Sequence, residues 1–447
     1  MKKHVMIPTK VFKSLLFLAL IFSFVNISAQ TEKTRTIEKT FSGKTALWAS
    51  HRYGDIIMKK GSGNQIKAIL KLKASGNDTN ELEKFLNEFE LNASESADNK
   101  VDIQTGNYIE SWNTVKVIAT VKSTIKLKNG KTYNGISKFD MTLELYVPKL
   151  RYATLENKYN KIRVEEGTSD ILLINLYDGE LEAPGTYSKL NMDMKYSEAE
   201  VGNFTSSESK LYDCDIVMGN GQSLTLESKY SEIKAGSVQN ITLDSYDDKF
   251  TFADAKENVK IKDKYSEFTF NGEVGDIMLD LYDSQVVAGN AGNIKIAGSK
   301  YTEYTFQDTK SIEINSSYDD AIKVAKTASL SVNESKYTEY EIGSLSKVLK
   351  IKSYDDEIRV RNVGGEFEEF TFDGKYTDVT LPIPSSVKYE IEAYLKYGKL
   401  YFPEKELEAG VYKEKNSEVN IQGKLKGAGG NAPKVKINSY DGTIRLN

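Results

Sequence analysis

The sequence predicts an all-β protein built as a single-stranded parallel β-helix, a solenoid with 18-residue coils, carrying a small α+β insertion near its N-terminus. A tyrosine motif recurs along most of the chain, with a mean spacing of 18 residues between Tyr246 and Tyr354. Short alternating strand patterns recur at the same interval, and proline is absent from residues 185 to 381. The lack of proline fits a central ladder, because each strand needs its N–H groups. An 18-residue unit with two short strands cannot bury its own apolar face, so the units must stack.

Residues 1–29 have the pattern of a signal peptide. Lysines at 2, 3, 10 and 13 precede an apolar run at residues 14–25, and Ser28-Ala29 offers a cleavage site before Gln30. The run is shorter than the ~20 residues that a membrane-spanning helix needs. We therefore expect an exported chain without a transmembrane segment in its mature part, located in the periplasm, at the outer-membrane surface or outside the cell.

Composition excludes several classes of function. Loss of the four signal-peptide lysines would take the formal net charge from −4 to −8, which argues against a nucleic-acid partner. Cys214 is the single cysteine, so an intrachain disulfide is excluded, and we expect it to be a small buried residue. His4 leaves with the signal, and a lone His51 cannot build a multi-histidine zinc site. We expect His51 to be structural, and we expect neither a cofactor nor a metal.

Residues 30–150 differ from the repeats. Tyr53 in "HRYGDI" suggests an opening coil. Residues 81–91 place four apolar side chains at helical spacing, with Asn80 and Glu83 as a candidate cap. Residues 114–147 alternate like strands around an Asn129-Gly130 hairpin turn. We expect this helix and hairpin to be an insertion that caps an open sheet edge.

Residues 151–382 should form the regular β-helix. Their tyrosines alternate between K-Y-[S/T/N]-[E/D/K] and [S/L]-Y-D-[D/G/S/C] contexts, with spacings of 19 and 17 from Tyr246 to Tyr354. Downstream apolar positions repeat every 18 residues: Phe250, Phe268, Val286, Tyr304, Ile322, Tyr340 and Ile358. The structural period is therefore 18, with coils ~4.8 Å apart and a rod roughly 60 Å long. The crossover rule favours a right-handed coil, although left-handed solenoids with coils of this length exist.

The alternation has a physical reason in stacked coils. Tyr246, Lys264 and Tyr282 would lie in one column, and Asp247, Tyr265 and Asp283 in the next. Placing tyrosine between like charges doubles their separation to ~9.5 Å. Strand parity would point Lys264 and Lys300 into the core, and burial of unpaired lysines is costly. We therefore expect the chain to turn a corner at this column, and a core position for these lysines would refute the register.

Residues 383–447 should hold the C-terminal coils and cap, with a flexible loop at 423–434 and "VKINSYDGTIRLN" as the closing coil. The signal peptide, "YGDI" at 53–56, the repeated Y-D-[DG]-x-[IF]-x-[VF] coils and "SYDGTIRL" near the end resemble the bacterial "putative adhesin" β-strand-repeat family, which is related to auto-transporter adhesin heads. The resemblance covers nearly the whole mature chain. It implies a β-helix and a cell-envelope location, and it carries over no catalytic residues.

These features favour a structural or adhesin-like protein of the cell envelope. The candidate ligand-binding surface is an exposed ladder that consists of Asp247, Tyr265, Asp283, Tyr301, Asp319, Tyr337 and Asp355. Its partner would be a cell-surface polysaccharide or an envelope protein, unless the ladder merely stiffens and solubilises the rod.

Two other functions are weaker candidates. A polysaccharide-acting enzyme needs two carboxylates with divergent pKa values in a cleft. Pairs such as Asp247-Asp248 are part of the repeat, so we expect no catalysis; the loop at 362–370, where the period fails, reads as a surface bulge. Calcium binding would need a glycine-rich acidic pattern, which the Asp-Asp turns lack. The oligomeric state and the role of the N-terminal insertion stay open.

Overall fold

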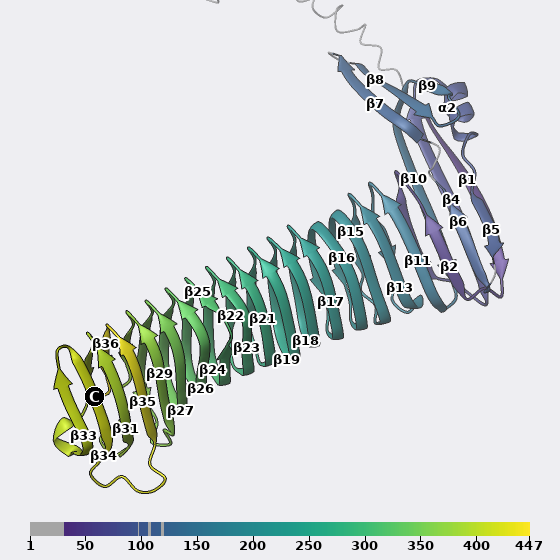
Figure 1. The fold of residues 1–447 in the computed structure, drawn as a ribbon. Helices are drawn as coiled ribbons and strands as arrows, with labels where there is room; N and C mark the ends of the chain where they lie inside the picture. The colour runs from purple at the N-terminus through teal and green to yellow at the C-terminus, as the bar shows by residue number, and fades with distance from the viewer. Residues whose placement is uncertain (1–30, 97, 106–108, 118–119) are drawn as a thin grey trace, which may run out of the picture.

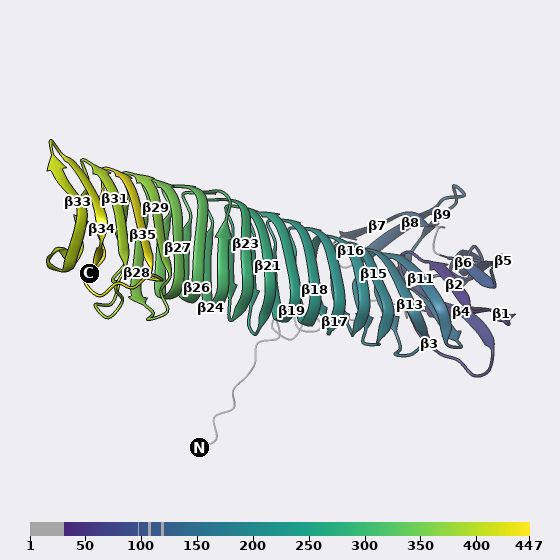
Figure 2. The ribbon, with the colours of Figure 1, turned by 60° about the horizontal axis from the view of Figure 1, so that its bottom comes forward.

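The structure is a computed structural model and describes residues 31–447 apart from 97, 106–108 and 118–119. The signal peptide expected at residues 1–29 lies outside the described residues. About 13 coils stack into one long β-solenoid, with a further sheet at its N-terminal end (Figures 1 and 2). The predicted fold class is confirmed.

The N-terminal elements are β1 (Thr31–Ser42), β2 (Ala46–Ser50), β3 (Asp55–Lys60), β4 (Gln65–Gly76), α2 (Thr79–Leu86), β5 (Asn92–Ser96), β6 (Lys100–Gln104), β7 (Ile109–Val117), β8 (Thr120–Leu127), β9 (Thr132–Asn134) and β10 (Ile136–Val147). The regular coils contain β11 (Leu150–Lys158), β12 (Ile162–Val164), β13 (Ser169–Tyr177), β14 (Glu180–Ala183), β15 (Tyr187–Val201), β16 (Phe204–Met218), β17 (Gly221–Lys229), β18 (Glu232–Tyr246), β19 (Lys249–Lys264), β20 (Glu267–Phe270), β21 (Val274–Tyr282), β22 (Gln285–Ala288), β23 (Ala291–Lys300), β24 (Glu303–Ile314), β25 (Ser317–Tyr318), β26 (Ala321–Lys336), β27 (Glu339–Tyr354), β28 (Glu357–Val363), β29 (Glu369–Lys375) and β30 (Asp378–Thr380). The C-terminal elements are β31 (Glu390–Lys396), β32 (Lys399–Tyr401), the 3-10 helix η1 (Glu404–Glu406), β33 (Leu407–Lys415), β34 (Glu418–Leu425), β35 (Lys434–Tyr440) and β36 (Thr443–Arg445).

Parallel pairing fixes the coil length. Phe250 pairs with Phe268, Phe268 with Val286, and Val286 with Tyr304. Each step is 18 residues, as the apolar repeat predicts. The preceding step is one residue shorter, because Ile233 pairs with Phe250.

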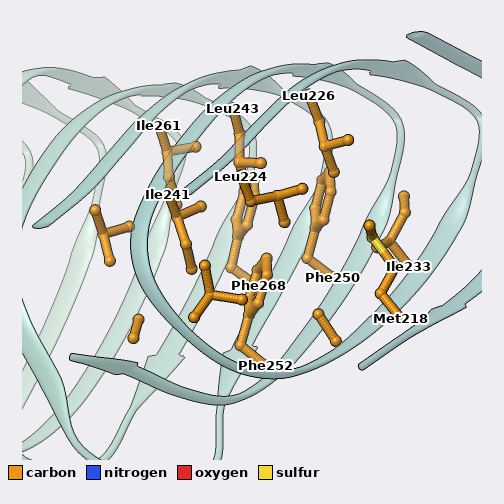
Figure 3. Packing of buried hydrophobic residues seen from close by; sticks show 14 of the residues in the cluster. Met218, Leu224, Leu226, Ile233, Ile241, Leu243, Phe250, Phe252, Ile261 and Phe268 are labelled. Carbon is orange, nitrogen blue, oxygen red and sulfur yellow. The ribbon is translucent and has the colours of Figure 1, made fainter. Parts of the chain in front are cut away.

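The interior of the solenoid is a continuous apolar column. Phe250 and Phe268 stack with ring centroids 5.1 Å apart and ring planes 3° apart, and Phe252 stacks on Phe270 at 5.4 Å. Leucine and isoleucine side chains from the facing strands pack against these rings (Figure 3). Burying one such side chain contributes roughly 1.5–3 kcal/mol, so every coil stabilises its neighbours.

The N-terminal insertion continues the sheet and covers the end of the first coil. Strand β6 pairs in parallel with β2, and β5 then pairs antiparallel with β6. Strand β10 pairs in parallel with β3 and antiparallel with β4, and β1 pairs antiparallel with β4. The edges of the opening coil are therefore occupied by strands, whereas β7, β8 and β9 around the predicted hairpin form a separate three-stranded sheet. That the helix and hairpin act as a cap stays a prediction.

The predicted helix forms, but its N-terminal cap differs from the prediction. The Asp78 side chain accepts hydrogen bonds from the backbone N–H groups of Asn80 and Glu81. Asn80 therefore lies inside the helix: Asp78, Thr79 and Asn80 are all residue types that favour the N-cap, and the first of them is used. The buried Phe85 ring packs on Phe89 just past the helix end.

The last segment of the chain is not the outermost coil, so the expected closing position of β35 and β36 is wrong. Strand β35 pairs in parallel with β29 on one side and with β31 on the other (Figure 1). Strand β36 pairs in parallel with both β30 and β32. The chain leaves a one-coil gap after β30, builds the outer strands β31–β34, and returns to fill the gap. Antiparallel β33 forms the outer edge, with a bulge between Ala409 and Val411 of the kind that blunts exposed edges.

Candidate binding surface: a tyrosine ladder along the solenoid

One row of tyrosine rings follows the solenoid from end to end, and we call it the tyrosine ladder. Neighbouring ring centroids are 5.2–6.1 Å apart. Beyond the first pair every contact is edge-to-face, with ring planes 76–87° apart. In spatial order the members are Tyr53, Tyr159, Tyr177, Tyr196, Tyr212, Tyr230, Tyr246, Tyr265, Tyr282, Tyr301, Tyr318, Tyr337, Tyr354, Tyr376, Tyr440 and Tyr397.

The two sequence motifs deliver their rings from two different backbone positions. In a K-Y coil the tyrosine itself adopts a left-handed conformation, as Tyr265 does with φ 70°. In a Y-D coil the aspartate takes that position, as Asp247 does with φ 56°, and the ring comes from the residue before it. Each regular coil from Tyr159 to Tyr376 therefore contributes one ring, and Tyr53, Tyr440 and Tyr397 add rings from the opening, inserted and outer coils. The ring planes alternate because their backbone origins alternate.

This left-handed residue is the corner that the sequence predicts. The corner interrupts the alternation of inward and outward side chains that runs back from Phe268. Lys264, which that alternation would point into the core, is therefore exposed. Lys300 also lies outside the core, with its ammonium group 4.7 Å from the ring centroid of Tyr301 and 4.8 Å from that of Tyr318. The prediction of a corner is confirmed.

A bulky residue rarely adopts a positive φ, and for L-residues the conformation costs roughly 1–2 kcal/mol. Each edge-to-face ring contact stabilises the fold by ~0.5–1.5 kcal/mol, and a ring inside the ladder makes two such contacts. The contacts can therefore offset the backbone strain.

The structure places all predicted ladder residues on the surface. The exposed fractions of Tyr265, Tyr301 and Tyr337 are 42%, 39% and 46%. Asp247, Asp283, Asp319 and Asp355 are exposed beside them.

Sequence reasoning missed the other half of the ladder. It separated the Y-D tyrosines, such as Tyr246 and Tyr282, from the K-Y tyrosines by assigning them to another column. The pairing of Tyr246 with Lys264 confirms that their backbone positions share a column. The Tyr246 ring nevertheless contacts the ring of Tyr265, from the neighbouring column, so the rings of both motifs form one row. The signal was present in the sequence, since each regular coil carries one motif tyrosine, whichever of the two motifs it uses.

Carboxylates run along one side of the ladder, and we call this strip the acidic margin. It combines the left-handed aspartates with the column two residues further on, which pairs Glu180 with Glu198 and Glu198 with Asp215 in successive coils. Its members are Asp178, Glu180, Glu198, Asp213, Asp215, Glu232, Asp247, Glu267, Asp283, Glu303, Asp319, Glu339, Asp355, Glu357, Asp378 and Asp441, all exposed or half-buried. Lysines 161, 249 and 399 interrupt the strip. Beside Tyr196 the surface forms a hollow of about 540 Å³, whose lining includes five margin carboxylates together with Lys161.

A second ladder, of buried polar side chains, lies beneath the rings. Oδ1 of Asp248 accepts hydrogen bonds from the Ser231 N–H (2.6 Å) and the Ser228 hydroxyl (3.2 Å). Asp263 accepts from the hydroxyls of Ser245 and Ser284 at 2.6 and 2.7 Å. These bonds join successive coils at the corner, where they supplement the backbone bonds and where the Asp248 N–H donates to the Ser266 hydroxyl at 2.9 Å.

Burial disfavours the charged form of the aspartates at this corner. It raises the pKa of Asp248 from 3.8 to about 7 and that of Asp356 to about 6, against the opposing effect of hydrogen bonds that favour the carboxylate. Burial also raises the pKa of Asp320.

The Asp-Asp pairs are divided by the corner and do not form two-carboxylate sites. Asp247 is exposed whereas Asp248 is 4% exposed, and the same division holds for Asp319-Asp320 and Asp355-Asp356. In the described part of the chain, no group of three or more His, Cys, Asp or Glu side chains is arranged to hold a metal ion.

The two isolated residues that the sequence singled out are buried. His51 is 2% exposed, with Nδ1 hydrogen-bonded to the Thr105 hydroxyl, and burial lowers its pKa to about 3. Cys214 is buried, and its thiol donates to the carbonyl oxygen of Tyr212 at 3.3 Å. Both positions agree with the expected structural roles.

The chain was compared with protein-family models, curated proteins and solved structures. No protein-family model matches it, and no curated protein matches it. One solved structure, titled "a putative cell adhesion protein" from Clostridium sporogenes, is 10% identical, covers 93% of this chain and 99% of its own, and has a TM-score of 0.16. Another, titled "a putative adhesin" from Parabacteroides merdae, is 10% identical, covers 76% and 96% of the two chains, and has a TM-score of 0.22. Within the described ranges, no helix is both long and apolar enough to span a membrane.

Proposed function

We propose that the protein is an exported cell-envelope solenoid with an adhesin-like role, and that the tyrosine ladder is the face with which it binds extended polymers at the cell surface. The observation that carries the proposal is the continuity of the ladder over the whole solenoid. Aromatic rings gain binding energy from a partner's apolar surface while their hydroxyl groups form hydrogen bonds. A straight row of such rings suits a long, linear partner.

The exposure of the rings also supports a binding role. The more exposed rings come from K-Y coils, such as Tyr196 and Tyr397 at 47% and 54%, and therefore repeat every second coil.

Co-sedimentation of residues 30–447 with insoluble polysaccharides and isolated cell envelopes tests the proposal. The test variant replaces Tyr265, Tyr301 and Tyr337 with Ser. A matched control replaces Tyr394, Tyr401 and Tyr412, which are comparably exposed outside the ladder. Selective retention that the test variant loses and the control keeps is the expected result. No retention on any material, from a protein that melts cooperatively, would leave the ladder as architecture alone.

A further inference from the structure

We propose that the tyrosine ladder and its acidic margin form a docking surface for an extended basic polypeptide in the polyproline II conformation, with a lysine or arginine at about every third residue. This inference rests on the proposed binding function of the ladder and specifies the class of its ligand. Three features carry it: cations that the ladder already holds, the sign of the charge beside it, and its repeat distance.

The ladder binds cations from its own chain. The Lys300 ammonium lies over two successive rings, 4.7 Å from the centroid of Tyr301 and 4.8 Å from that of Tyr318. At the N-terminal end, the Arg52 guanidinium lies 4.6 and 5.3 Å from the centroids of Tyr53 and Tyr159. The space beside two neighbouring rings therefore accepts either basic side chain, through the attraction of a cation to aromatic faces.

The acidic margin adds attraction of the same sign. Aspartates at the left-handed position recur in every Y-D coil, from Asp178 to Asp355, and all are exposed. Carboxylates two residues further on lie in many coils, but several already form ion pairs with the chain's own cations, among them Glu180 with Lys161 and Glu232 with Lys234. The left-handed aspartates therefore carry most of the attraction. A basic chain lying on the margin side of the rings would meet these aspartates along its length, and the attraction would speed its association. On the ring column itself it would meet exposed lysines such as Lys195, Lys229 and Lys264, which confine it to the margin side.

The repeat distance selects the conformation of the partner. Exposed K-Y rings and margin aspartates recur every two coils, which is ~9.6 Å at ~4.8 Å per coil. Polyproline II rises ~3.1 Å per residue, so three residues advance ~9.3 Å. A β-strand has a side-chain period of two residues, ~6.6 Å, and does not match. A polyproline II chain with a basic residue on every turn thus stays in step with the ladder over several repeats, and it is a recognised partner of aromatic surfaces.

Peptide binding to the mature protein tests this inference. The probe is a fluorescent peptide of Pro-Lys-Pro repeats, about 18 residues and so roughly 56 Å long in polyproline II. One comparison peptide has the same composition with its lysines clustered in blocks, and another replaces lysine with glutamine. Binding is measured by fluorescence anisotropy at low and at physiological salt, because surface charge effects weaken with ionic strength.

The variant for this test replaces Asp247, Asp283, Asp319 and Asp355 with Asn, which tolerates the left-handed conformation. A control variant makes the corresponding amide substitutions at Glu166, Glu208, Glu273 and Asp308, which are exposed outside the ladder and its margin. We expect the evenly spaced lysine peptide to bind roughly ten-fold more tightly than either comparison peptide. We expect the Asp→Asn variant to lose roughly ten-fold in affinity and the control to lose little, as four exposed charge pairs would give.

The remaining outcomes separate the two proposals. Equal binding of the evenly spaced and clustered peptides would overturn the inference, since charge without spacing would then suffice. Polysaccharide retention that depends on Tyr265, Tyr301 and Tyr337, together with no peptide binding, would overturn the inference and leave the proposed function standing. Absence of both kinds of binding would overturn both.

Discussion

The buried aspartates beneath the tyrosine ladder should make the solenoid more stable at mildly acidic pH than above neutrality. The pKa of Asp248 is about 7 in the folded chain against an ordinary value of 3.8, and that of Asp356 is about 6. A group whose pKa rises on folding takes up a proton when the chain folds. The contribution of these two aspartates to the free energy of unfolding is therefore fully present below pH 3.8, and it is lost as the pH rises through 6 and 7.

The size of the effect follows from these values. One pKa unit corresponds to 1.36 kcal/mol, so a decrease from pH 8 to pH 5 recovers about 3 kcal/mol at Asp248 and about 1 kcal/mol at Asp356. Burial raises the pKa of Asp320 as well, which adds in the same direction. Below about pH 4 the trend should reverse, because Lys131 and Lys210 lower the pKa values of the Glu88 and Glu227 carboxylates and protonation removes those pairs.

Urea unfolding followed by far-ultraviolet circular dichroism between pH 5 and pH 8 measures the effect. The Asp248→Asn and Asp356→Asn double variant should unfold at higher urea than the wild type at pH 8, with a flatter pH dependence. The Asp247→Asn variant changes the exposed neighbour and should keep the wild-type dependence. A wild-type midpoint that rises from pH 5 to pH 8, or a double variant with an unchanged slope, would refute the reasoning.

The other predictions concern the core and the inserted coil. Phe268→Ala should destabilise the chain by about 3–5 kcal/mol in urea unfolding, because it removes a ring that is 1% exposed and stacked on Phe250; a loss below about 1 kcal/mol would mean that the column collapses around the gap. Gly442→Ala should cost at least about 1–2 kcal/mol, since Gly442 has φ +95° and a Cβ would lie 2.2 Å from the Thr377 carbonyl oxygen; an unchanged melting temperature would contradict this. Deletion of residues 434–447 should abolish amide exchange protection in β31 and β34 while β15–β27 stay protected, and uniform loss of protection would show that the inserted coil supports the whole rod.

The sequence predicted the features that depend on a repeating apolar pattern. Phe250, Phe268 and Val286 fall 18 residues apart because they stack in one column, so the sequence alone reveals the period. The surface position of Lys264 followed from the cost of burying a charge. These arguments needed only burial and periodicity.

The features that were not predicted depend on exceptions to local rules. A left-handed tyrosine such as Tyr265 runs against the steric preference of bulky residues, so the convergence of all the rings was not foreseen. Asp247 and Asp248 have the same side chain, and only the corner between them decides which one is buried. The inserted position of β35 requires a contact between segments about 65 residues apart, which a consecutive repeat does not suggest.

Even so, the inserted coil obeys the alternation of motifs in space. Tyr376 and Tyr397 both follow lysine and are consecutive among the ladder tyrosines along the chain, which breaks the order of K-Y and Y-D units. Tyr440, from a Y-D unit, lies between them, with ring centroids 5.7 and 5.5 Å away and ring planes 81° and 80° from its own. If the alternation only reflected duplication of a two-coil unit, the spatial order would follow the chain order, so contacts between coils must maintain it.

The N-terminal end supplies the contrasting case. There Tyr53 follows arginine and Tyr159 follows lysine, so two coils of the same type are neighbours. Both tyrosines are left-handed, with φ 63° and 69°, and their rings stack with planes 18° apart instead of meeting edge-to-face. Rings from equivalent backbone positions therefore lie nearly parallel, whereas rings from alternating positions lie nearly perpendicular. The alternation of two motifs is thus the device that sets ring orientation as well as charge spacing, and this single exception shows what the ladder becomes without it.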